Sequence, residues 1–220
     1  MGRPHCPDRP ASLFLESIFA TTMNALSLQS AHSALVDRLR EDDASLLLQG
    51  LGITGFALLT VLGAQMEFRL YLWEVPITLQ NAAVYASGLY LGARNGMLAQ
   101  LLYLALGLFL PVFVGDGHGI AYFTGAVTAG YLVSYPIAAA VIGALSQRWK
   151  SLSGSTLSTM LGAAIVFSIG VVWLHYAAGH GTWMESIDKG FLRFVAIDLV
   201  KVLAVGLLYS GTRAMGSFLK

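Results

Sequence analysis

The chain is poor in charge and nearly free of cysteine. Charged residues occupy 11% of its 220 positions, against about 25% in a typical soluble domain. The single cysteine, Cys6, cannot form a disulfide within the chain, and no Cys/His cluster has the spacing of a zinc site. Lys and Arg total 13, and Asp and Glu total 12. This balance lacks the basic excess that nucleic-acid binding would need.

The sequence also lacks the motifs of common enzymes. It has no Walker A pattern for holding the phosphates of ATP and no H-E-x-x-H zinc motif. Ser87-Gly88 has no surrounding G-x-S-x-G context that would make the serine a nucleophile. We therefore expect a protein that is not an enzyme and that carries neither a metal nor a cofactor.

Long apolar runs are the dominant feature, and 56% of the residues are hydrophobic. A helix needs about 20 mostly apolar residues to cross a hydrocarbon core about 30 Å thick. Six segments approach this pattern, at 45–66, 76–93, 95–114, 126–147, 156–178 and 191–212. The sequence predicts an all-α integral membrane protein, built as a six-transmembrane-helix bundle.

Positive charges predict how this bundle is oriented. With six spans both termini lie on the same side of the membrane, and short cytoplasmic loops carry an excess of Lys and Arg. The terminal side would hold seven such residues: Arg38, Arg40, Arg94, Arg148, Lys150, Arg213 and Lys220. The opposite side would hold three: Arg69, Lys189 and Arg193. Both termini are therefore predicted to be cytoplasmic, in a multi-pass protein of the cell membrane.

The predicted organisation has two parts. Residues 44–220 form the six-helix membrane domain. Residues 1–43 hold three prolines and much of the charge, and we expect a cytoplasmic N-terminal extension that is partly disordered.

Asp198 and Lys201 stand inside the last apolar segment. Their spacing of three places them on one helix face, roughly 10 to 15 Å below the outer end of the helix at 1.5 Å per residue. A charge at this depth costs on the order of 2.5 to 3.5 kcal/mol. Two interpretations follow, a neutralised pair that locks helix packing, or a pair that lines a polar pocket.

Two further segments could contribute polar groups. The second apolar segment opens with Thr78, Gln80 and Asn81, whose amides supply donors and acceptors together, as a urea or amide ligand requires. The same residues could equally form a hydrated helix start. The glycine-rich loop around Gly117 and His118 allows backbone N–H groups to approach a ligand, although most such loops are only turns.

Several ordered motifs between residues 63 and 145 resemble the BioY-type substrate-binding components of energy-coupling factor (ECF) vitamin transporters, which take up biotin. The motifs are Gly63-Ala64-Gln65, Pro76-Ile77-Thr78-Leu79-Gln80, Leu91-Gly92-Ala93-Arg94, Leu102-Tyr103-Leu104 with Gly107, Leu110-Pro111-Val112-Phe113 and Gly130-Tyr131-Leu132. Their order along the chain makes the resemblance specific.

The resemblance implies six helices, cytoplasmic termini and a biotin pocket near the outer face. It also implies that Asp198 and Lys201 help to hold the ligand. The loop after Pro-Val-Phe often carries an Arg in the family, where this chain has His118, so the contact to the ligand carboxylate stays unassigned. The candidate substrate-binding residues are Thr78, Gln80, Asn81, Tyr103, Gly117, His118, Asp198 and Lys201.

The resemblance further implies partners: membrane lipid, a transmembrane coupling subunit and two ATPase subunits. The family uses small residues on the first helix to dock a membrane partner, often as A-x-x-x-A. The corresponding row here is Gly52, Thr60 and Ala64, interrupted by Phe56.

Two other classes of function stay open on the sequence alone. One is a non-transport membrane scaffold, in which Asp198 and Lys201 are a structural pair. The other is an ion-coupled carrier for another small solute, which inverted repeats would favour. No such repeat is evident in the sequence.

Overall fold

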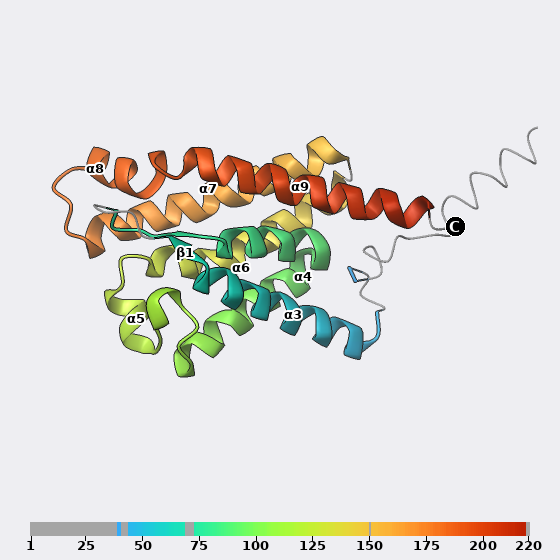
Figure 1. Ribbon diagram of the computed structural model, residues 1–220, viewed down its shortest axis with the longest axis horizontal. Helices are drawn as coiled ribbons and strands as arrows, with labels where there is room; N and C mark the ends of the chain where they lie inside the picture. The colour runs from blue at the N-terminus through green and yellow to red at the C-terminus, as the bar shows by residue number, and fades with distance from the viewer. Residues whose placement is uncertain (1–38, 41–43, 69–72, 150, 219–220) are drawn as a thin grey trace, which may run out of the picture. The chain divides into compact units, whose positions relative to one another are not determined.

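The fold was analysed in a computed structural model that describes residues 39–40, 44–68, 73–149 and 151–218, with side chains as far as Arg213. The described part of the chain is helical apart from two short strands (Figure 1). Its elements are α3 (Leu46–Gln65), β1 (Glu67–Phe68), β2 (Ile77–Thr78), α4 (Gln80–Phe109), η1 (Val114–Asp116), α5 (Ile120–Gly125), α6 (Ala129–Arg148), α7 (Leu152–Ala177), α8 (Trp183–Ile187), η2 (Asp188–Leu192) and α9 (Val195–Phe218).

Helix α3 begins where Ser45 caps it, because the Ser45 side chain accepts a hydrogen bond from the backbone N–H of Leu48. Its leucines point away from the rest of the chain, and Leu47 is 74% exposed. Its polar residue Thr60 is fully buried instead. An apolar exterior with polar groups inside suits a helix that lipid surrounds.

Helix α4 is a hairpin of two arms, 80–91 and 93–109, that meet at Gly92. Gly92 has a φ of 78°, a left-handed conformation that glycine adopts without a steric cost. The arms fold back on each other, since the Gln100 side chain on the second arm donates to Ser87 Oγ on the first at 3.0 Å. The second and third predicted segments are thereby confirmed as separate helical arms.

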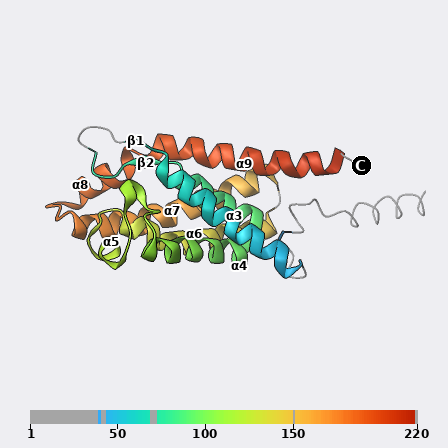
Figure 2. The same cartoon turned by 60° about the horizontal axis from the view of Figure 1, so that its bottom comes forward.

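Helices α4 and α6 pack so closely that glycine is required between them. A Cβ at Gly143 would lie 2.2 Å from the backbone nitrogen of Ala93, and a Cβ at Gly88 would lie 2.6 Å from the carbonyl oxygen of Ala139. Helix α7 packs on α6, and α9 runs along α7 and the first arm of α4 (Figure 2). Small residues at such contacts let membrane helices approach each other.

The six predicted apolar segments all have helical counterparts, with two changes at the connections. Strands β1 and β2 pair antiparallel, with Glu67 opposite Thr78. The predicted last span, 191–212, starts within the π-helix η2, and α9 itself begins at Val195. The predicted loop before that span contains the short helix α8. Among the residues that the structure describes, three helices, α3, α6 and α7, are long and apolar enough by length and composition to cross a membrane.

The prediction of a cytoplasmic extension at 1–43 falls almost wholly outside the described residues. The structure does describe Arg40, whose guanidinium donates to Tyr209 Oη and to the carbonyl oxygen of Gly143. Arg40 therefore bridges α9 and the last turns of α6. The two-part organisation of the chain stays a prediction.

Candidate binding site

A polar cavity lies where the first arm of α4 meets α6, α7, η2 and α9. Its volume is about 40 Å³, enough for about two or three water molecules. Polar and aromatic side chains share its wall. The lining residues are Val75, Pro76, Thr78, Gln80, Asn81, Val114, Thr128, Tyr131, Tyr135, Phe167, Gly190, Phe194, Asp198 and Lys201.

Asp198 lies in the wall of this cavity, and one of its oxygens accepts no hydrogen bond from the described residues. Its side chain is nearly buried, and Tyr85 donates a hydrogen bond to Asp198 Oδ2 at 2.9 Å. Asp198 Oδ1 has no hydrogen-bond partner in the described part of the chain, and Lys201 Nζ lies 4.0 Å from it. A buried acceptor without a donor costs free energy. Asp198 Oδ1 is therefore a ready acceptor for an N–H group in the cavity.

Four side chains form a hydrogen-bonded row beside Asp198. Tyr103 Oη donates to Gln80 Oε1 at 3.3 Å, and Gln80 Nε2 donates to Tyr135 Oη at 2.6 Å. Tyr135 Oη donates in turn to Asn81 Oδ1 at 2.9 Å. The row fixes both amides at the start of α4 and orients Asn81 in the cavity wall.

The structure brings together five of the eight predicted binding residues: Thr78, Gln80, Asn81, Asp198 and Lys201. Tyr103 stands behind Gln80 and does not line the cavity. Gly117 packs under the ring of Tyr122, and exposed His118 bonds only to the nearby carbonyl of Asp116. The glycine loop thus reaches the cavity through Val114 and not through Gly117 or His118. A role of these residues in binding stays a prediction.

The predicted docking row lies inside the bundle. Thr60 is fully buried and shares a hydrogen bond with Gln100 of α4. Ala64 is fully buried, and a Cβ at Gly52 would lie 2.9 Å from Leu91. Gly52 and Thr60 therefore face α4, Thr60 and Ala64 are buried, and Gly52 is partly exposed. A Cβ added at Gly50 or Gly55 of α3 would meet nothing within 4 Å.

The sequence did not single out Tyr85, Tyr131, Tyr135 or Phe167 as site residues. A usable signal exists for the tyrosines, because a buried tyrosine hydroxyl needs a hydrogen-bond partner. Tyr131 and Tyr135 are four residues apart, so they share one face of α6. Tyr131 Oη donates to the carbonyl oxygen of Gly190 at 2.8 Å, which ties η2 to the cavity.

A second, larger cavity is an apolar groove between α7 and α9, with a volume of about 700 Å³. Its lining is apolar except for Ser168 and Asp198. Asp198 and Phe167 line both cavities and so stand between them. The smaller cavity holds the donors and acceptors that a polar ligand needs, and it is the candidate site.

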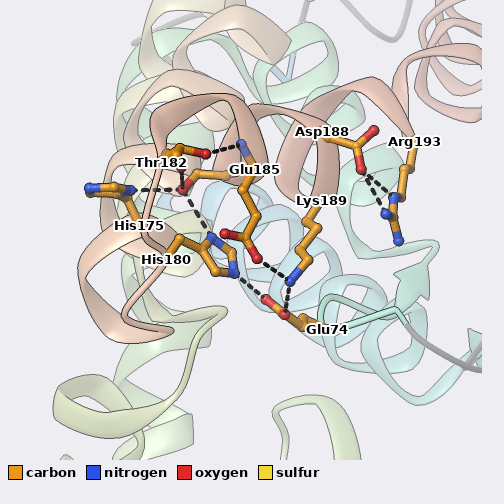
Figure 3. Close-up of polar contacts among 9 residues, drawn as sticks. Glu74, His175, His180, Thr182, Glu185, Asp188, Lys189 and Arg193 are labelled. Atoms are coloured by element: carbon orange, nitrogen blue, oxygen red, sulfur yellow. Dashed lines mark hydrogen bonds and ion pairs between the residues drawn. The ribbon is translucent and has the colours of Figure 1, made fainter.

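A cluster of charged side chains joins Glu74, which directly precedes Val75 of the cavity wall, to the α8–η2 segment (Figure 3). We call Glu74, His180, Glu185 and Lys189 the Glu74 cluster. Lys189 Nζ bonds to Glu74 at 2.6 Å and to Glu185 at 2.8 Å, and His180 Nε2 lies 2.8 Å from the other oxygen of Glu74. Beside it, Arg193 pairs with Asp188 at 2.6 Å.

These contacts favour the charged forms of Glu74, Glu185 and Lys189. Partial burial acts to raise the pKa of Glu74, but hydrogen bonds from Lys189 and His180 outweigh it and lower that pKa. The hydrogen bond from Lys189 likewise lowers the pKa of Glu185. Bonds to Glu185 and Glu74 raise the pKa of Lys189. The carboxylates and the ammonium thus stabilise one another as ions.

The candidate site can recognise a neutral polar ring that carries both N–H and C=O groups. Asp198 Oδ1 accepts, the Lys201 ammonium donates, and Asn81 can do both. Phe167 and Phe194 supply apolar surface. Among the described residues no cluster of His, Cys, Asp or Glu could hold a metal ion.

Comparison with known proteins places this arrangement in a family. The model of the BioY family matches residues 42–217. The chain belongs to the BioY family. The match includes the whole wall of the candidate site.

Curated BioY relatives match most of the chain. A protein of Lysinibacillus sphaericus named probable biotin transporter BioY is 35% identical over 164 residues, which are 71% of this chain and 82% of the relative. The biotin transporter BioY of Thermotoga maritima is 34% identical over 154 residues, or 70% of this chain and 88% of the relative.

A solved structure shares the fold. It is the crystal structure at 2.1 Å of the S-component for biotin from an ECF-type ABC transporter, with a TM-score of 0.72 and 22% sequence identity. The superposition covers 79% of this chain and 95% of that one. The BioY fold therefore extends to this chain's helices.

Proposed function

We propose that this protein captures biotin as the substrate-binding component of an ECF-type vitamin transporter of the cell membrane. The observation that carries the proposal is Asp198 Oδ1, which accepts no hydrogen bond from the described residues and lines a cavity of a BioY-family chain. The names of the curated relatives support the choice of biotin.

The cavity chemistry agrees with the ureido ring of biotin. Asp198 Oδ1 would accept a ureido N–H, and Lys201 or Asn81 would donate to the ureido carbonyl. The faces of Phe167 and Phe194 would cover the apolar edges of the bicyclic ring. The cavity has room for only about two or three waters. Its wall segments must therefore move apart before a ligand the size of biotin can enter.

Equilibrium binding tests the choice of ligand. Purified protein should bind biotin at least about 100-fold more tightly than thiamine or riboflavin, a difference of about 2.7 kcal/mol. Titration with labelled biotin, with the other two vitamins as competitors, measures this. A folded preparation that binds no biotin would contradict the proposal. Concentrative uptake by the isolated chain in liposomes without ATP would favour the ion-coupled carrier.

We also propose that the chain crosses the membrane six times, with both termini in the cytoplasm. The spans are α3, the two arms of α4, α6, α7 and α9. The supporting observation is the charge bias of seven to three. The candidate site and the Glu74 cluster would then lie toward the outer face.

Cysteine labelling tests this orientation. Cysteines placed at Ser153 and Gly181, both exposed, should react with an impermeant reagent from the inside and the outside respectively. Cys6 is changed to Ser in both variants, so that the introduced cysteine is the single thiol that the reagent can label. The reverse labelling pattern would contradict the orientation and the outward placement of the site.

The chain would work with a transmembrane coupling subunit and two ATPase subunits, since it has no phosphate-binding loop of its own. The row Gly52, Thr60 and Ala64 packs on α4, so docking would use the opposite side of α3. That side holds exposed leucines such as Leu51 and Leu58. Co-purification from the native host tests the assembly.

A further inference from the structure

We infer that the Glu74 cluster is a clasp that sets how fast ligand enters and leaves the candidate site. The inference rests on the proposed function, because it concerns the same cavity. It starts from the position of the cluster, which joins two wall segments that are far apart in sequence (Figure 3).

The two partners of the clasp each precede a residue of the cavity wall. Glu74 is followed by Val75 and Pro76, and Lys189 is followed by Gly190, and all three followers line the cavity. The bond of 2.6 Å between Lys189 and Glu74 therefore fixes the distance between the two wall segments. His180 adds a second contact to Glu74, at 2.8 Å.

An aromatic contact reinforces the same junction. The ring of Trp73 meets Phe194 edge-on at 5.1 Å between centroids, and the Arg193 guanidinium stands 5.9 Å from the Trp73 ring. Phe194 lines the cavity. Residues 73–76 are thus held to residues 180–194 by both charge and ring contacts.

A cavity of about 40 Å³ is too small for a vitamin-sized ligand, so its wall must move during ligand exchange, and the clasp would resist separation of these two segments. The ion pairs of the clasp are partly exposed, with Glu74 32% and Lys189 24% accessible. Partly exposed pairs are screened by salt and change an equilibrium by a factor of about 1.5 to 5. The clasp therefore sets an opening rate without itself recognising the ligand.

Glu74→Gln removes the charge and keeps the size of the side chain. Both the association and the dissociation rate of biotin should rise about threefold, while the dissociation constant stays within about twofold of the parent. Stopped-flow binding with the full chain in detergent measures both rates. Raising the salt should speed exchange in the parent and have little effect in Glu74→Gln.

Glu185→Gln is the matched control. It removes a carboxylate from Lys189 within the α8–η2 segment and leaves both contacts of Glu74 in place, so both rates should stay near those of the parent. Lys189→Gln is the second clasp variant, for use if Glu74→Gln does not fold. A purely structural role of the cluster would lower thermal stability in these variants without changing the two rates.

Hydrogen–deuterium exchange without ligand separates this inference from the choice of biotin. The backbone N–H groups of Val75 and of residues 77–79 should exchange about threefold faster in Glu74→Gln than in the parent or in Glu185→Gln. If the parent binds no biotin, the proposed function is wrong. The exchange rates would then still test whether the Glu74 cluster holds the two wall segments together. Unchanged exchange and unchanged biotin rates in a folded clasp variant would overturn the inference.

Discussion

Replacing Asp198 with Asn is expected to weaken biotin binding about 10- to 150-fold. The change keeps the shape of the side chain and the bond from Tyr85, but it removes the charged acceptor. A hydrogen bond to a charged group is worth about 1.5 to 3 kcal/mol, which corresponds to that range of affinity. Equilibrium titration of the purified variant measures the loss.

The matched control is Asp188→Asn, which removes a carboxylate that pairs with Arg193 outside the cavity wall. Its affinity should stay within about twofold of the parent, a difference below roughly 0.5 kcal/mol. Lys201→Met should behave like Asp198→Asn. The double variant should lose less than the sum of the two single losses, because the residues act as a unit.

A scaffold role predicts a different result for the same variants. Thermal stability would fall, because a buried partner is lost, while the surviving folded fraction would bind biotin with parental affinity. Normal affinity in both Asp198→Asn and Lys201→Met would therefore contradict the role of this pair. The site would then have to rest on Asn81 and Gln80.

Gly143→Ala is expected to destabilise the bundle by about 1 to 3 kcal/mol, the usual cost of overpacking. The added methyl would lie 2.2 Å from the backbone nitrogen of Ala93, and no rotamer of alanine can avoid it. The helices α4 and α6 must move apart. Thermal unfolding in detergent should show a melting temperature lower by about 2–10 °C.

Gly55→Ala is the control for that experiment, since a Cβ at Gly55 meets nothing within 4 Å. Its melting temperature should equal or exceed that of the parent, because alanine favours a helix more than glycine does. An unchanged melting temperature for Gly143→Ala would contradict the close packing of α4 and α6.

The helical segments could be predicted because apolar runs of membrane length are explicit in the sequence. The turn at Gly92 was also predictable, since two apolar arms of α4 flank the polar pair Arg94 and Asn95. The extra turn η2 was not, because a π-helix leaves no periodic signal. The predicted last span therefore began four residues too early.

Which face of a helix points inward was harder to predict. On α3 the leucines face outward and Thr60 faces inward, the reverse of a soluble helix. The docking row Gly52, Thr60 and Ala64 was predicted from the family's small-residue pattern, which does not tell which face of α3 packs on α4, and its role in docking stays a prediction. On the sixth segment the charges of Asp198 and Lys201 gave a direct signal, because lipid excludes them.

The most direct test of the account is an experimental structure of this protein with biotin bound. We predict that the ureido ring lies in the cavity between α4, α6 and α9, with a ureido nitrogen about 2.7–3.2 Å from Asp198 Oδ1. A structure with biotin bound elsewhere, such as in the apolar groove between α7 and α9, would contradict this placement. In such a structure Asp198 Oδ1 would accept no hydrogen bond from the ligand.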